Sequence, residues 1–182
     1  MALVYRKPFA ALFTDEPPEP LEDLPDLRRL FHILRDEGAQ VTELLPDIAE
    51  AVGEALARRD IYNELAVNAP AFRLTIDPEQ DLDEVALELR GDLSVSWSEQ
   101  AAIRNDNEAR RFWTAKVEAI GVLVFQFTAP MKQARGFAVG SGRPPIVAVN
   151  SGDAEYGRTF SIVHELVHVA LPVPTDVNEI QI

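Results

Sequence analysis

The hydrophobic spacing of the chain changes at Gly121, and this change limits the fold more than any other feature of the sequence. Before Gly121 the apolar residues recur at intervals of three and four, as in amphipathic helices. After it, β-branched and aromatic residues predict strands over 122–127, 135–139 and 145–150. Helical spacing returns over 156–171, and two prolines just beyond this range end the helix. A helical region followed by a small three-stranded sheet and a last helix is an α+β fold.

The part of the chain before Gly121 divides into an acidic, proline-rich segment and a helical region. Residues 15–26 are rich in proline and in acidic residues, which predicts an extended connector without a helix. Helical spacing then extends over 27–68, 81–89 and 98–120, with breaks expected near Pro46 and Asn105. We therefore expect the chain to divide into three parts, with bounds at 1–26, 27–95 and 96–182.

Two features of the composition limit the chemistry and the partners of the chain. The sequence contains no cysteine, so any metal ion must be bound by histidine and carboxylate side chains. The formal net charge of -13 opposes binding to nucleic acid and to anionic membranes, and it favours a basic protein partner. The sequence has neither a signal-peptide core nor a run of about 18 apolar residues, so we expect a cytoplasmic protein.

The helix predicted over 156–171 carries two of the three histidines of the chain. His164 and His168 are four residues apart, so both imidazoles lie on one face of a helix and can bind one tetrahedral Zn²⁺. Glu165 is then placed to accept a proton from a water molecule on the metal. The pattern predicts a zinc-dependent hydrolase and favours cleavage of a peptide bond.

The alternative for this pattern is an amphipathic helix on which two histidines share a face by coincidence. The apolar residues around His164 and His168 indicate a buried or half-buried helix. Two unpaired imidazoles would cost free energy in such a helix, whereas a shared metal ion explains both.

The third protein ligand that a catalytic zinc site needs is not part of the motif. Leu171 and Pro174 occupy the positions where a longer histidine pattern would need glycine and histidine, so a downstream carboxylate is the remaining class of ligand. Thr175 is a suitable N-cap for a new helix, which could bring Glu179 to the metal. Glu179 could equally be an exposed acid that complements the dipole of that helix.

The region around the motif resembles the ImmA/IrrE metallopeptidases. The resemblance is carried by three runs, in the order found in that family: Arg135-Gly136-Phe137, Ile146-Val147-Ala148-Val149-Asn150, and Arg158-Thr159-Phe160-Ser161-Ile162-Val163-His164-Glu165-Leu166-Val167-His168. It covers residues 108–171 well, and the proline-rich segment more loosely.

The resemblance implies a cytoplasmic zinc endopeptidase that cleaves, or pairs with, a helix-turn-helix repressor of the Xre type. It implies that His164 and His168 are zinc ligands and that Glu165 is the catalytic base. The third ligand of the family is a glutamate on the next helix, in a segment that continues into an Asn-x-Phe-Ala run. This chain lacks that run, and both Glu179 and Gln181 stand at suitable spacings.

Two hypotheses of different classes follow from the sequence. The first is a zinc endopeptidase with the small sheet packed beside the motif helix, in a domain over 96–182 that we expect to continue beyond Ile182. The second is a non-catalytic toxin or regulatory module, which keeps the peptidase scaffold and acts by binding a basic partner protein. The uncertain third ligand favours the second hypothesis, and the presence of Glu165 favours the first.

Overall fold

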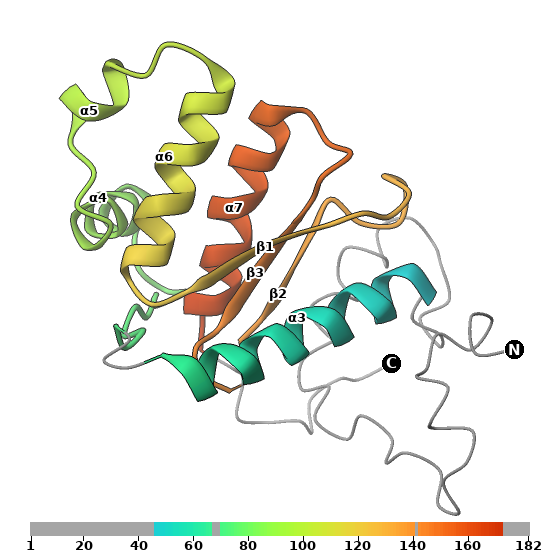
Figure 1. The fold of residues 1–182 in the computed structure, drawn as a ribbon. Coiled ribbons are helices and arrows are strands. Elements are labelled where there is room, and N and C mark those ends of the chain that lie inside the picture. The colour runs from blue at the N-terminus through green and yellow to red at the C-terminus, as the bar shows by residue number, and fades with distance from the viewer. Residues whose placement is uncertain (1–45, 67–69, 141, 173–182) are drawn as a thin grey trace, which may run out of the picture.

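The computed structural model describes residues 46–66, 70–140 and 142–172, which form helices around a three-stranded sheet (Figure 1). In chain order the elements are α3 (Pro46–Leu65), α4 (Leu82–Asp92), α5 (Trp97–Ala101), α6 (Asp106–Ala119), β1 (Leu123–Phe127), β2 (Gly136–Val139), β3 (Ile146–Asn150) and α7 (Glu155–Ala170). The predicted α+β class is confirmed. In the described part of the chain, no helix combines the length and the apolar character that crossing a membrane requires.

The sheet has the strand order β1-β3-β2, so the last strand in the sequence lies in the middle. β3 runs parallel to β1 and antiparallel to β2. All five residues of β3 are buried, because the strand has a neighbour on each edge and helices on both faces. β2 is an edge strand: within the described residues it pairs with β3 alone.

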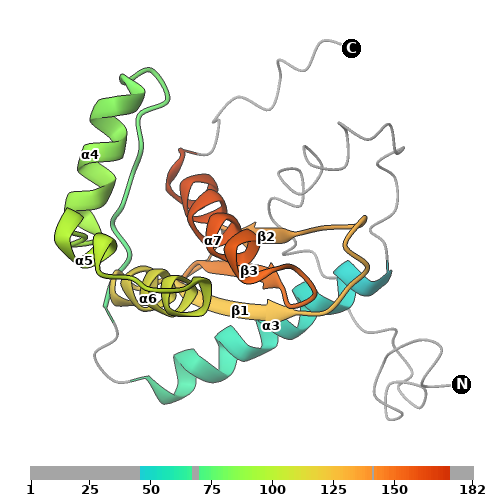
Figure 2. The same cartoon turned by 90° about the horizontal axis from the view of Figure 1, so that it is seen from above.

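Two hydrophobic clusters hold the helices on opposite faces of this sheet. On one face, Ile48 and Val52 of α3 pack with Phe137, Ile146 and Ala148. On the other face, a second cluster joins α6 and α7 to β3 through Val117, Val147, Val149, Ile162 and Leu166. Figure 2 shows the resulting three layers, with α3 and α7 on opposite sides of the strands. The expected packing of the sheet beside the motif helix is confirmed.

The helices before the sheet agree with the predicted spacing, and the break expected near Asn105 is present. The range predicted as helix over 98–120 forms two helices, α5 and α6, because Asn105 caps a new helix. Its Oδ1 accepts a hydrogen bond from the backbone N–H of Glu108, which satisfies a donor that the first turn leaves unpaired. Of the helical range expected over 27–68, the part from Pro46 is α3. The proline-rich segment over 1–26 lies outside the described residues.

Gly121 marks the change from helix to strand in the structure as it does in the sequence. Its φ of 86° is in the left-handed region that favours glycine. A Cβ at this position would lie 2.4 Å from the carbonyl oxygen of Pro70, so the segment from Pro70 onward passes directly over the turn. The same segment then reaches α7, where the N–H of Ile76 donates to the carbonyl of Ala170 at 2.9 Å.

Candidate functional site

Helix α7 buries one face and exposes the face that carries the histidines. Ile162 and Leu166 are buried against the sheet and α6, and Ala170 at the end of the helix is buried as well. On the outer face, Tyr156, Phe160 and His164 follow one another at intervals of four residues, and all three are exposed. His168 continues this line and is half-buried. Both imidazoles lie on one face of the helix, as its spacing predicts, but this face is at the surface: His164 is exposed and only His168 is half-buried.

The two histidines of the motif lie close enough to share a ligand. Their Nε2 atoms are 3.1 Å apart, and the ring planes meet at 79° with centroids 4.7 Å apart. Two nitrogens bound to one tetrahedral zinc at the usual bond length would be about 3.3 Å apart. The pair thus fits the separation that zinc requires. The same distance also allows a direct hydrogen bond between the rings, if one of them carries its proton on Nε2.

The third ligand is not found in the part of the chain that the structure describes. Within residues 46–66, 70–140 and 142–172, no group of three histidine, aspartate or glutamate side chains is arranged to hold a metal ion. Glu179 and Gln181, together with the helix predicted to begin at Asp176, lie outside the described residues. The assignment of Glu179 as a ligand therefore stays a prediction.

Glu165 is buried beside the histidine pair, on the side of α7 that faces the edge strand. Its side chain is only 3% exposed, and this burial raises the pKa of its carboxyl to about 8. The neighbour that makes room for it is Gly136, the first residue of β2. A Cβ on Gly136 would lie 3.0 Å from Oε1 of Glu165 and 3.0 Å from the carbonyl oxygen of Ala148. A side chain at this position would therefore crowd both the carboxyl of Glu165 and the backbone of β3.

A cavity of about 580 Å³ opens next to these residues. One wall is the loop before β2, residues 131–136, and the other is the outer face of α7 from Tyr156 to Glu165. We call this cavity the α7 groove. His164 and Glu165 line one end of it, and Tyr156 lies two helical turns away. Its volume is in the usual range for sites that bind small molecules or peptide side chains.

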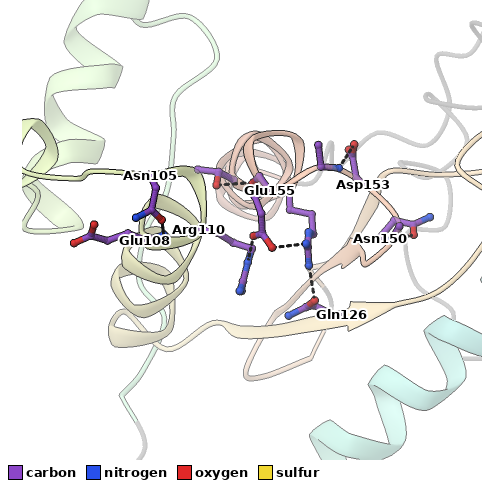
Figure 3. A network of polar contacts seen from close by, with 11 residues as sticks. Asn105, Glu108, Arg110, Gln126, Asn150, Asp153 and Glu155 are labelled. Carbon is purple, nitrogen blue, oxygen red and sulfur yellow. Dashed lines mark hydrogen bonds and ion pairs between the residues drawn. The ribbon is translucent and has the colours of Figure 1, made fainter.

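Asn150, at the end of β3, fastens the loop wall of the groove. It is fully buried, and its Nδ2 donates to the carbonyls of Ala129 and Ala134, both at 2.9 Å. Its Oδ1 accepts from the N–H of Gly152 at 2.9 Å. Every hydrogen-bonding atom of this amide thus has a partner, as a buried amide requires. Figure 3 shows Asn150 close to the start of α7.

A second polar network holds the first turn of α7. Glu155 accepts hydrogen bonds at 2.6 Å from Arg110 of α6 and from Arg158 one turn further along α7. Arg158 also donates to Gln126 of β1 at 3.0 Å, so helix, helix and strand are joined (Figure 3). The hydrogen bond from Arg110 is the largest cause that lowers the pKa of the Glu155 carboxyl. The network fixes the first turn of α7, at the Tyr156 end of the α7 groove.

Sequence reasoning found the residues on α7 and missed those that support them. The spacing of Glu155 and Arg158 is a helical pair that could have been found locally. Arg110 is 45 residues away from Glu155, and no local pattern links them. Gly136 lies in one of the runs that carry the family resemblance, but its closeness to Glu165 depends on how strand and helix pack.

Comparisons with known proteins give no assignment: no family model, curated protein or solved structure matches the chain. The resemblance to the ImmA/IrrE peptidases therefore rests on the residues quoted for it in the sequence.

Proposed function

We propose that this chain is a zinc-dependent endopeptidase whose reaction takes place beside α7. One observation carries the proposal: two imidazole Nε2 atoms lie 3.1 Å apart next to a buried glutamate, at the end of a cavity large enough for a peptide segment. His164 and His168 would hold the metal, and Glu179 is the proposed third ligand. When bound, zinc supplies a polarised carbonyl and a water molecule of lowered pKa.

Glu165 is the proposed general base. In peptide hydrolysis the oxygen of water forms a bond with the carbonyl carbon, and the bond from that carbon to the amide nitrogen breaks. A zinc ion beside Glu165 would lower the pKa of its carboxyl from the value that burial gives it. The carboxylate of Glu165 would then accept a proton from the water and deliver it to the departing nitrogen. Because Gly136 has no side chain, the carboxyl of Glu165 can lie close to β2. The base would thus act at the edge of the sheet.

The open edge of β2 is the proposed binding site for the backbone of the substrate. An extended peptide can add to an exposed strand through main-chain hydrogen bonds, which bind without regard to side chains. A strand added to β2 would pass Gly136 and therefore the carboxylate of Glu165. Such a strand would bring a peptide bond near the histidine pair.

The substrate or partner that we propose is a helix-turn-helix repressor of the Xre type, in the cytoplasm. The partner class and the compartment come from the ImmA/IrrE resemblance. The charge of the chain agrees with this class, because a net charge of -13 attracts a basic protein and repels free nucleic acid. We do not expect direct contact with DNA.

The second candidate function is a non-catalytic module that binds a basic partner on a peptidase scaffold. The observation that favours it is that the described residues provide only two of the three ligands of a catalytic zinc site. Against it stands Glu165, since a buried carboxyl costs stability and binding alone gives no reason for one there.

Zinc content and cleavage together test the proposal. We expect one zinc per chain in the wild type, and a loss of zinc in His164→Ala and in His168→Ala. Glu165→Gln should keep the zinc and the fold but lose cleavage of a proteome-derived peptide library, as read by mass spectrometry of new termini. Arg111→Ala, on the outer surface of α6, is the control that should change neither. Wild-type zinc occupancy in both histidine variants would contradict the metal site, and cleavage by Glu165→Gln would contradict the role of the base.

A further inference from the structure

The α7 groove differs in charge from the rest of this acidic protein. Lys132 and Arg135, both from the loop before β2, lie at its edge and are exposed. No acid among the described residues pairs with Lys132. Arg135 forms one ion pair, with Asp153 at 3.3 Å, and its side chain is still 68% exposed. The groove thus presents two cations in a chain with a net charge of -13.

The interior of the groove is apolar and is bounded by aromatic side chains. Tyr156 and Phe160 are 68% and 70% exposed, although large apolar side chains are usually covered. Between them and the loop lie small residues, Gly136 and Gly157 among them. A Cβ on Gly157 would lie 2.6 Å from the carboxylate of Asp153, so glycine at this position makes room for that acid. The aromatic rings on α7 and the small residues Ala134 and Gly136 on the opposite wall leave space for one large apolar side chain.

We propose that the α7 groove is a specificity subsite for an extended peptide that carries a large apolar residue next to an acidic residue. The apolar side chain would lie between Phe160 and the loop, and the acidic side chain would reach Lys132 and Arg135. This inference rests on the proposed function, because it takes the peptide to be the substrate of the histidine site at the end of the same groove.

The acidic preference of the groove does not conflict with a basic partner protein. The net charge acts on a whole partner during approach, whereas groups in a groove act on the residue that they touch. Salt screens the interaction of exposed charges over about 8–10 Å. A residue bound in the groove is therefore affected mainly by the charged groups next to it. A basic repressor with an acidic residue near its cleavage site satisfies both.

The charge preference can be tested by peptide binding. Three fluorescein-labelled peptides share a central leucine and differ only in its neighbours, which are aspartate, asparagine or lysine. Fluorescence anisotropy is measured with zinc-loaded Glu165→Gln protein, which should leave the peptides intact. We expect the aspartate peptide to bind about fivefold tighter than the asparagine peptide, and the lysine peptide to bind weakest.

Matched variants locate the preference in the groove. Lys132→Glu should reverse the order of the three peptides, whereas Arg111→Glu, the same change of charge on the outer surface of α6, should leave it unchanged. Tyr156→Ala should weaken all three peptides about fivefold through lost apolar contact. Leu87→Ala on α4, at a residue 63% exposed, should have no effect.

The outcomes separate this inference from the proposed function. Equal affinity for the three peptides, or equal effects of Lys132→Glu and Arg111→Glu, would overturn the subsite. Cleavage of all three peptides by the wild type at one rate would also overturn it, while it supports the peptidase. Charge-selective binding that depends on Lys132, with no cleavage by zinc-loaded wild type, would support the subsite and contradict the peptidase.

Discussion

Helix α7 is packed into the core of the fold, whereas α4 and α5 lie at its surface. α7 has six buried residues and packs on the central strand, and every residue proposed for catalysis lies on it or outside the described residues. α4 and α5 have no buried residue, and Figure 1 shows them at the periphery beyond α6. They are held through Leu93 and Val95 of the connection between them, which are buried in the second cluster. Arg90 of α4 also lies over the ring of Trp97 of α5, 3.7 Å from its centroid.

The comparison teaches that helical sequence spacing alone does not separate a structural helix from a peripheral one. The predicted helix over 81–89 repeats apolar residues at the same intervals as α7, yet on its apolar face Leu82 is 82% exposed, and Val85 and Leu89 are only half-buried. The predictions below contrast matched positions in the two regions, in order of decreasing effect.

The largest difference is expected from leucine deletion. Leu166→Ala removes a side chain with no exposed surface from between α7 and β3, and it should lower the free energy of unfolding by about 3–5 kcal/mol. Leu87→Ala on α4 should change it by less than about 0.5 kcal/mol. Urea unfolding followed by circular dichroism measures both. Equal losses would mean that α4 is packed as tightly as α7.

Asn150 should be next in importance, because it joins the loop wall of the groove to β3. Asn150→Ala leaves buried carbonyls without donors and should cost about 2–4 kcal/mol. Asn150→Asp has the same shape but replaces the donor with an acceptor that faces two carbonyls, so it should not restore stability. Asn63→Ala, at an exposed hydrogen bond, should cost less than about 1 kcal/mol. Restored stability in Asn150→Asp would contradict the donor role.

Alanine at two glycines should act in opposite directions in the two regions. Gly136→Ala places a methyl group against Glu165 and the Ala148 carbonyl, and should destabilise the fold by about 1–3 kcal/mol. Gly91→Ala in α4 meets no atom within 4 Å and should stabilise the helix by about 0.5–1 kcal/mol. Thermal unfolding midpoints show both signs. If peptidase activity is found, only Gly136→Ala should reduce it.

The smallest effect concerns the pH dependence of α5. Hydrogen bonds from Ser96, with a further one from Lys116, lower the pKa of Glu99 from its ordinary value of 4.5 to about 2. A carboxyl whose pKa is lower in the folded state stabilises that state above pH 4.5, and this contribution is lost as pH falls from 4.5 towards 2. Glu99→Gln should flatten this part of the curve of melting temperature against pH. An unchanged curve would show that the capping box is not formed in solution.

Much of the fold could be predicted from the sequence because its signals are local. The three strands and α7 agree with their predicted bounds to within one residue or two, and the break at Asn105 follows from capping chemistry. The placement of β3 between β1 and β2 could not be predicted, because an apolar run does not indicate which strands pair with it. A fully buried run such as 145–150 is nevertheless typical of a central strand.

The candidate site likewise has one part that local sequence predicts and another part that depends on tertiary packing. His164, Glu165 and His168 share a short segment, so helical geometry alone predicts that they cluster. Gly136 and Lys132 line the groove only because the fold brings their loop next to α7. A single sequence has no pattern that indicates this proximity. Glu179 depends on a turn after α7 and lies outside the described residues, so its role is still a prediction.

The way in which Asn150 holds the wall of the α7 groove has a consequence for how new specificities could arise. The amide binds main-chain carbonyls, at Ala129 and Ala134, and makes no demand on the side chains of the loop. Residues such as Lys132 can therefore be exchanged while the loop keeps its path. Natural or engineered substitutions can therefore change the side chains of this wall one at a time, while Asn150 holds the loop in place.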